Sequence, residues 1–188
     1  MRKKKKPQVI VLYGAMAVGK LTVAKIIAKK LNYHVTHNHL INNLVLSVFE
    51  RETLEANKIM EKLKYEFYEL CVKSSKNIVI THCYAHDYVS PTGLKDPIYM
   101  KRLETRLVNA GADVYFVHLK ASKAALLSRV ANKDRNQYHK LTKRSVLRRF
   151  LKTEDFETSA PVKSNLAIDN SNLSPEATAR KIIKTLKL

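Results

Sequence analysis

The sequence predicts an α/β domain in which helices cover both faces of a parallel β-sheet. Short apolar runs alternate with amphipathic segments of helical length along the chain. Strands that alternate with helices favour parallel pairing, because each helix carries the chain back to the edge where the next strand begins. A length of 188 residues, 45% of them apolar, suits one domain with a substantial core. We expect one domain over residues 8–188, preceded by a basic tail over residues 1–7.

Five strands are expected, and the first is the most clearly defined. Residues 8–13 form a short apolar run that ends at Gly14, which is typical of a buried strand. The other four runs are similarly short and contain β-branched or aromatic residues. They cover residues 33–36, 77–82, 114–119 and 166–168.

The segments between these strands carry apolar residues at helical spacing. In the second of them, Leu40, Leu44 and Val48 follow one another at intervals of four. Ser174 and Pro175 suit the N-cap and the first position of the last helix. That helix begins after Ser174, and the others are expected over residues 20–31, 38–50, 53–73, 98–110, 122–131 and 142–152.

The loop between the first strand and the first helix has the pattern of a phosphate-binding loop, Gly-x4-Gly-Lys-x-Thr. Its two glycines let successive backbone N–H groups turn toward one anion. The helix that follows adds the partial positive charge of its N-terminus, and Lys20 supplies a full charge for the β- and γ-phosphates. We therefore expect nucleotide binding by Gly14, Ala15, Met16, Ala17, Val18, Gly19, Lys20, Leu21 and Thr22.

The formal charge of the chain is +19, from 35 Lys and Arg against 16 Asp and Glu. This balance favours anionic ligands and leaves nucleic acid open as a partner. Much of the charge lies in residues 120–152, where eleven Lys and Arg stand against one acid, Asp134. Two cysteines exclude a disulfide framework and fit a reducing cytoplasm, and no apolar run is long enough to span a membrane.

On these residues, the chain resembles the P-loop small-molecule kinases, which include nucleoside monophosphate kinases and shikimate kinase. The resemblance implies a three-layer fold with strand order 2-3-1-4-5, and it implies ATP and Mg²⁺ as cofactors. It also implies a short lid over residues 132–141 and two arginines, Arg129 and Arg135, that act with Lys20 on the transferring phosphate. Two further residues match the loop that passes beside the adenine in this group, Asp169 and Asn170.

The phosphate-binding loop departs from the commonest pattern at one position. Ser or Thr usually follows the lysine and meets magnesium, but here Leu21 occupies that position and the hydroxyl comes one residue later, at Thr22. Kinases of the adenylate kinase type have a similar arrangement. We expect Mg²⁺ to be held through water, with Thr22 as one contact, or by another residue.

Polar residues at the ends of the second and third strands predict an acceptor site. Five of the seven histidines fall in these two regions, and neighbouring parallel strands end at one edge, where ligands bind. Many of the resembled kinases carry an acid at the end of the third strand, but here the first acid is Asp87, which disfavours shikimate and makes Asp87 the candidate catalytic carboxylate. Residues 36–39 replace the Thr-Gly-Asp-type entry of the nucleoside monophosphate kinases, which disfavours an ordinary nucleoside monophosphate. The candidate acceptor-binding residues are Thr36, His37, Asn38, His39, Arg51, Thr81 and His82.

Three roles remain open for the histidines. His37 or His39 could bind the acceptor or take a hydroxyl proton, because imidazole titrates near neutral pH. The pairs His37/His39 and His82/His86 also have a spacing that suits a transition metal. The third role is that of ordinary polar residues at strand ends.

The sequence thus predicts an ATP-dependent phosphotransferase that acts on a small hydroxylated or phosphorylated acceptor. Two alternatives keep the phosphate-binding loop. One is a kinase of polynucleotide 5′-hydroxyls, in which the basic stretch follows the nucleic acid backbone. The other is a nucleotide-binding module without transfer activity.

Overall fold

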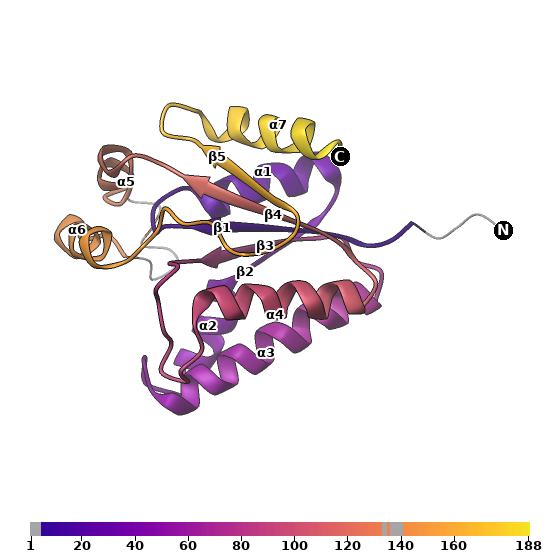
Figure 1. Ribbon diagram of the computed structural model, residues 1–188, viewed down its shortest axis with the longest axis horizontal. Helices are drawn as coiled ribbons and strands as arrows, with labels where there is room; N and C mark the ends of the chain where they lie inside the picture. The colour runs from indigo at the N-terminus through magenta and orange to yellow at the C-terminus, as the bar shows by residue number, and fades with distance from the viewer. Residues whose placement is uncertain (1–4, 133–134, 136–140) are drawn as a thin grey trace.

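The computed structural model describes residues 5–132, 135 and 141–188, and its centre is a parallel five-stranded sheet (Figure 1). The strand order is β2-β3-β1-β4-β5, which confirms the expected order. All neighbouring strands pair in parallel, so their carboxyl ends share one edge of the sheet. The strands are β1 (Gln8–Gly14), β2 (His34–His37), β3 (Ile78–Cys83), β4 (Asp113–Lys120) and β5 (Asn165–Asp169).

Helices cover both faces of this sheet, as the three-layer prediction requires (Figure 1). One face carries α1 (Lys20–Leu31) and α7 (Pro175–Leu186), which pack side by side. The other face carries α3 (Leu54–Lys73) and α4 (Asp96–Asn109). The remaining helices lie near the carboxyl edge of the sheet. They are α2 (Asn38–Leu46), α5 (Lys123–Arg129) and α6 (Arg144–Thr153).

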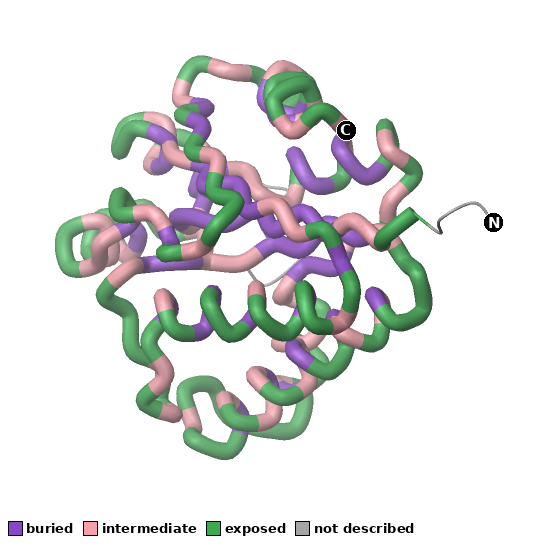
Figure 2. Tube along the Cα trace, turned by 45° about the vertical axis from the view of Figure 1, so that its right-hand side comes forward, coloured by how far each residue is buried: buried purple, intermediate pink, exposed green. Residues whose placement is uncertain are grey.

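Two apolar clusters form the core, one on each face of the sheet. Alternate residues of β1 point to opposite faces, so Ile10 and Leu12 belong to one cluster and Val11 and Tyr13 to the other. Both faces of β1 are therefore buried, which explains its continuous apolar sequence. Figure 2 shows that the buried residues are concentrated in the strands, whereas the outer helices alternate between buried and exposed positions.

The second helix forms, but the residues that predicted it do not face the core. Leu40, Leu44 and Val48 are 56%, 66% and 80% exposed. Val45 is the buried residue of α2, and it packs against α3 in a small third cluster. The helix ends at Leu46, four residues earlier than expected.

The helix α4 begins two residues earlier than expected, at Asp96. A proline is tolerated in the first turn of a helix, because the N–H groups of that turn have no partner inside the helix. Pro97 therefore belongs to the helix rather than to the preceding loop. The difference matters because it places Asp96 at a helix start that lies near the carboxyl edge of the sheet.

The expected lid over residues 132–141 and the basic tail over residues 1–7 fall largely outside the described residues. In the part of the chain that is described, no helix has the length and apolar character needed to cross a membrane.

Candidate functional site

The turn between β1 and α1 has the backbone geometry of an anion-binding loop. Gly14 and Gly19 have φ angles of 129° and 99°, a region that favours glycine. Ala17 also lies in the left-handed region, with φ of 65°. The chain curls between β1 and the first turn of α1, so backbone N–H groups and the helix N-terminus face the same space.

Gly14 is required for a second reason, which is its contact with the neighbouring strand. A Cβ atom at this position would lie 2.3 Å from the carbonyl oxygen of Leu119 in β4 and 3.2 Å from the ring of His118. Any larger residue would push β1 and β4 apart at the start of the loop. The first glycine therefore fixes where the loop leaves the sheet.

Lys20 lies inside the curl of the loop. Its Nζ donates hydrogen bonds of 2.7 Å to the carbonyl oxygens of Gly14 and Ala15. Burial lowers the pKa of Lys20, and the nearby charge of Arg135 lowers it further, while Cys83 acts in the opposite direction. A cation whose charged form is disfavoured in this way would gain from an anion in the same space.

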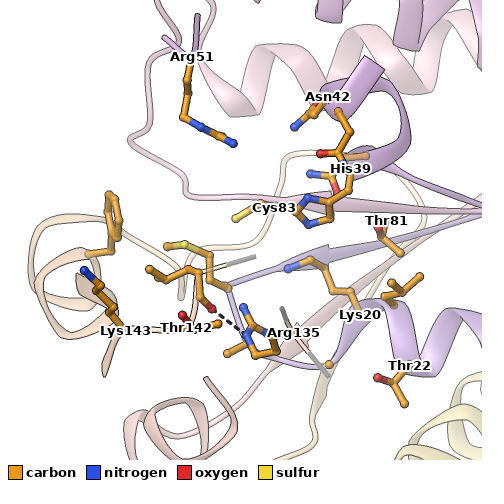
Figure 3. A pocket seen from close by; sticks show the side chains of 18 of the residues that line it. Lys20, Thr22, His39, Asn42, Arg51, Thr81, Cys83, Arg135, Thr142 and Lys143 are labelled. Carbon is orange, nitrogen blue, oxygen red and sulfur yellow. Dashed lines mark hydrogen bonds between the residues drawn. The ribbon is translucent and has the colours of Figure 1, made fainter. Parts of the chain in front are cut away.

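A cavity of about 640 Å³, here called the first cavity, opens in front of Lys20. Four of its described lining residues are cations, and Glu52 is the one acid among them. Figure 3 shows Arg51 and Arg135 on opposite sides of the space in front of Lys20. Arg135 Nε also donates to the carbonyl oxygen of Leu141 at 2.8 Å, which holds its position. The four cations are Lys20, Arg51, Arg135 and Lys143.

Several residues predicted from the sequence do line the first cavity. Met16, Ala17, Gly19 and Lys20 of the loop border it, with Leu21 and Thr22 from the first turn of α1. Thr22 is exposed and is one of the residues that line the cavity (Figure 3). The predicted acceptor residues at this cavity are Asn38, His39, Arg51 and Thr81.

Arg129 was expected to clamp a phosphate, but the structure places it in the frame of the loop. Its Nη1 donates to Asn170 Oδ1 at 2.9 Å, and its Nη2 donates to the carbonyl oxygens of Asn170 and Ser171 at 2.8 and 3.0 Å. It does not line either cavity described here. Arg129 thus holds the loop after β5 in this structure, and its contact with a phosphate stays a prediction.

Asn170 connects that loop to the phosphate-binding loop. It is buried, and its Nδ2 donates to the carbonyl oxygen of Val18 at 2.9 Å. Asp169 accepts hydrogen bonds from the hydroxyl and N–H of Ser171, which lower its pKa. These two predicted nucleotide contacts therefore use their side chains on the protein itself.

A second cavity of about 360 Å³ adjoins the first and has a different character. Four carboxylates line it against two cations, a formal balance of −2 for the described residues. The two cavities share seven lining residues, so they adjoin one another, and together they are called the cleft. The carboxylates are Glu52, Glu61, Asp96 and Glu154, the cations are Arg51 and Lys64, and the shared residues are Met16, Asn38, Asn42, Arg51, Glu52, Cys83 and Phe150.

Asp96 and His82 form a pair in the second cavity. The His82 Nε2 lies 3.7 Å from Asp96 Oδ1, and the His82 ring stacks on Tyr99 with ring centres 4.6 Å apart. Asp96 Oδ2 accepts a hydrogen bond of 2.9 Å from the N–H of Ala85, which holds the carboxylate in place. A fixed carboxylate beside an imidazole can accept a proton from a bound hydroxyl.

Asp87, the predicted catalytic carboxylate, lies outside both cavities. Its Oδ1 accepts a hydrogen bond of 2.7 Å from the N–H of Asp155, on the segment after α6. Asp87 is exposed and fixes that segment. Asp96 occupies the place in the cleft where Asp87 was expected.

The histidines do not gather as expected. His39 lines the first cavity and His82 the second, while His86 Nδ1 pairs with the hydroxyl of Tyr84 at 2.9 Å. Thr36 and His37 are buried at the end of β2 and line neither cavity. Among the described residues, no group of three or more His, Cys, Asp or Glu could hold a metal ion, which gives the metal-binding alternative no support.

The sequence reasoning missed the acids of the second cavity. The Asp-Pro pair at residues 96 and 97, which suits a helix start, was one available signal. Glu61 and Lys64 lie three residues apart, so they share a face of α3, and nothing in their spacing shows that this face meets a cavity. Glu154 follows a strongly basic helix, and nothing in the sequence around it indicates that it lines a cavity.

Comparisons with known proteins agree with this architecture. A family model described as an AAA domain matches residues 10–149. No curated protein matches the chain in sequence.

Several solved structures have a similar fold. A sugar kinase from Janibacter sp. HTCC2649 is 16% identical with a TM-score of 0.66, over 96% of this chain and 95% of that chain. Shikimate kinase from Acinetobacter baumannii in complex with shikimate is 20% identical with a TM-score of 0.60, over 96% and 93%. The Mycobacterium tuberculosis APS kinase in complex with AMPPNP and APS is 12% identical with a TM-score of 0.62, over 98% and 100%. At these identities the likeness concerns the fold.

Proposed function

The chain belongs to the AAA domain family and has the fold of the P-loop small-molecule kinases, and from that premise we propose that it is an ATP-dependent phosphotransferase. The proposed acceptor is a small molecule with a hydroxyl group. One observation carries the proposal: a phosphate-binding loop faces a cation-rich cavity, and that cavity shares seven lining residues with a second one that contains a fixed carboxylate. Donor and acceptor can therefore meet inside one cleft.

The proposed donor end is the first cavity. Backbone N–H groups of the loop and the N-terminus of α1 would bind the β- and γ-phosphates, and Lys20 would turn from the Gly14 and Ala15 carbonyls toward them. Arg135 and Arg51 would stabilise the negative charge on the transferring group, because both line the same space. Arg129 would act indirectly, through Asn170 and the carbonyl of Val18.

The first cavity also suits Mg²⁺ held mainly through water. Glu52 is the one carboxylate among its described lining residues, and the other oxygen donors are hydroxyl and amide groups. Magnesium prefers oxygen ligands and commonly keeps several waters beside substrate phosphates. Thr22 is the proposed protein contact, and the bound ion would neutralise charge on the phosphate oxygens.

The proposed acceptor end is the second cavity. A hydroxyl oxygen of the acceptor would form a bond to the γ-phosphorus, while the bond from that phosphorus to the bridging oxygen of ADP breaks and ADP takes the electron pair. Asp96 would receive the hydroxyl proton, and His82 would hold the carboxylate or pass the proton on. Asn38, which lines both cavities, and His39 of the first cavity would orient the acceptor.

The acids of the second cavity weigh against a polynucleotide acceptor. A 5′-hydroxyl carries phosphates on its other side, and these would lie close to the carboxylates of the cavity. Lys143, the N-cap of the basic helix α6, lines the first cavity, so its charge lies at the proposed donor end of the cleft.

Turnover with pooled acceptors tests the proposal. We expect ADP release from ATP and Mg²⁺ to rise with a pool of hydroxylated small molecules, and Lys20→Ala to lower it by about 1000-fold, because one preorganised charge is lost from the transferring group. Lys29→Ala, an exposed position on the same helix, is the matched control and should keep full turnover. Acceptor-independent ADP release, or equal turnover in the Lys20 variant, would contradict the proposal.

A further inference from the structure

The second cavity is acidic in a chain that is strongly basic. The chain carries a formal charge of +19 with 16 acids in all, yet four of those acids line this one cavity. Carboxylates brought together in a partly enclosed space repel one another, and the cost is greatest where water is displaced. Such a cluster calls for a compensating charge.

The described cations of the cavity, Arg51 and Lys64, compensate for two of the four charges and form no close ion pair with the carboxylates. Glu61 Oε1 accepts from the hydroxyls of Ser90 and Thr92 at 3.1 and 2.7 Å, and Asp96 accepts from a backbone N–H. These are neutral donors. Within the described part of the chain, none of the four carboxylates has a Lys or Arg nitrogen within 4.0 Å.

The titration of two residues agrees with this picture. Burial raises the pKa of Glu154, and the negative charges of Asp87 and Asp96 raise it further. Burial lowers the pKa of Lys64 to about 8, even though Glu61, Asp96 and Cys83 act to raise it. The cavity therefore concentrates negative charge around a lysine that burial itself disfavours as a cation.

We infer that the acceptor is a small hydroxylated amine, which binds the second cavity with its ammonium group among Glu61, Glu154 and Glu52 and its hydroxyl toward Asp96. This inference rests on the proposed phosphotransferase function and names the chemical class of its acceptor. An ammonium group supplies the missing positive charge and three N–H donors for carboxylate oxygens. A cavity of about 360 Å³ lies at the small end of ligand sites, so a compact amino alcohol or amino sugar suits it.

The same residues disfavour an acceptor that carries a negative charge. A carboxylate or phosphate on the acceptor would meet four carboxylates, with Lys64 and the shared Arg51 as the cations of the cavity. Arg51 also lines the first cavity, where the proposed donor phosphates would compete for it. The cleft therefore separates the anionic donor from a cationic acceptor.

Direct binding of matched probes tests the inference. Glucamine, sorbitol and gluconate share a six-carbon polyol chain and differ at one end, which is an ammonium, a hydroxyl or a carboxylate. The compounds 3-aminopropane-1,2-diol, glycerol and glycerate form a second set, which differs in the same way on three carbons. Binding would be measured at pH 7 by calorimetry and by ligand-observed NMR, with Mg²⁺ and AMPPNP present. In at least one set we expect the amine to bind about tenfold more tightly than the neutral probe, and the carboxylate to bind most weakly.

A charge variant locates the effect. Glu154→Gln should reduce the affinity for the amine about tenfold and leave the neutral probe within twofold, because one carboxylate is lost and the shape is kept. Glu66→Gln makes the same change of net charge on an exposed position of α3 outside both cavities, and should change neither affinity. Thermal unfolding of both variants would check that the fold is intact.

The outcomes separate this inference from the proposed function. Amine binding without ADP release would overturn the phosphotransferase and keep the amine site. Phosphoryl transfer to a neutral or anionic acceptor, with no preference for the amines, would overturn the inference alone. Equal binding of the three charge classes, or no binding by any of them, would also overturn it.

Discussion

The first and second cavities meet at Met16, Asn38 and Asn42, yet their linings carry opposite charge. The first has four cations against one acid among its described residues, and the second has four acids against two cations. The first combines the contiguous phosphate-binding loop with residues of α2, β3 and residues 141–143, whereas the second draws residues from α3, α4 and the ends of β3 and α6. One cleft can therefore sort two ligands by charge before any specific contact forms.

The net charge of the chain hides this contrast. A value of +19 suggested nucleic acid or another large anion as a partner. The local distribution gives a different answer, because a ligand responds to the charges within about 10 Å of it rather than to the total. The first cavity carries an excess of positive charge, whereas the second cavity is acidic.

The largest effect is expected from a substitution at the first glycine of the phosphate-binding loop. Gly14→Ala should remove nucleotide binding and cost at least about 3 kcal/mol of stability, because the new Cβ meets the Leu119 carbonyl at 2.3 Å in a backbone region that disfavours side chains. Nucleotide titration and thermal unfolding would measure both.

Gly93→Ala is the matched control for Gly14→Ala. Gly93 also has a positive φ, of 80°, but nothing lies within 4 Å of its Cβ position. It should cost about 1 kcal/mol and leave nucleotide binding unchanged. Similar losses in the two variants would mean that backbone conformation, and not the contact with β4, makes the first glycine necessary.

The next effect should be confined to the second cavity. Asp96→Asn should lower kcat by about 100-fold, because an amide cannot accept the hydroxyl proton, although it can still accept the hydrogen bond from Ala85. ATP affinity should stay within twofold, since Asp96 does not line the first cavity. Steady-state kinetics together with nucleotide titration would separate the two quantities.

Asp113→Asn provides the control for Asp96→Asn. Asp113 is exposed at the opposite edge of the sheet, where its carboxylate lies 4.0 Å from Lys6. It should keep wild-type kcat. If Asp96→Asn lost ATP affinity in proportion to kcat, the two ends of the cleft would not be separate.

The two cavities also differ in how far the sequence predicts them. The phosphate-binding loop is contiguous, and its function depends mainly on backbone conformation, so Gly14, Gly19 and Lys20 could be recognised from spacing. The strand order likewise followed from a resemblance that rests on this loop. The loop depends on local sequence, and the strand order could be predicted only through the family resemblance that the loop carries.

The second cavity could not be predicted because it depends on tertiary packing. His82 and Asp96 are fourteen positions apart and meet because α4 starts beside the end of β3. The positions of Arg129 and Asp87 in the sequence also do not indicate their partners. The side chain of Arg129 contacts Asn170, and that of Asp87 contacts the backbone of Asp155. The apolar residues of α2 were similarly ambiguous, since helical spacing identifies a helix but does not say which of its faces is covered.

The smallest expected effect concerns the charge of Lys64, and it would sharpen the contrast between the two ends. Lys64 faces Glu61 on its own helix, Asp96 of α4 and Cys83 of β3, and burial lowers its pKa to about 8. Burial also raises the pKa of Cys83, so that thiol stays neutral as Lys64 titrates. As the pH rises through about 8, Lys64 loses its proton and the formal charge of the second cavity falls from −2 to −3. A permanent cation should then bind more tightly, by about threefold in a partly screened site.

The N-trimethyl form of glucamine is the suitable probe, because its charge does not change with pH. Its affinity, measured by calorimetry between pH 6.5 and pH 9, should increase with pH, while the affinity for gluconate should decrease. Lys64→Met should remove this pH dependence and bind the cation at pH 7 about as tightly as the wild type does at pH 9, since the variant lacks the charge at every pH. An unchanged pH profile in Lys64→Met would show that another group controls the charge of the second cavity.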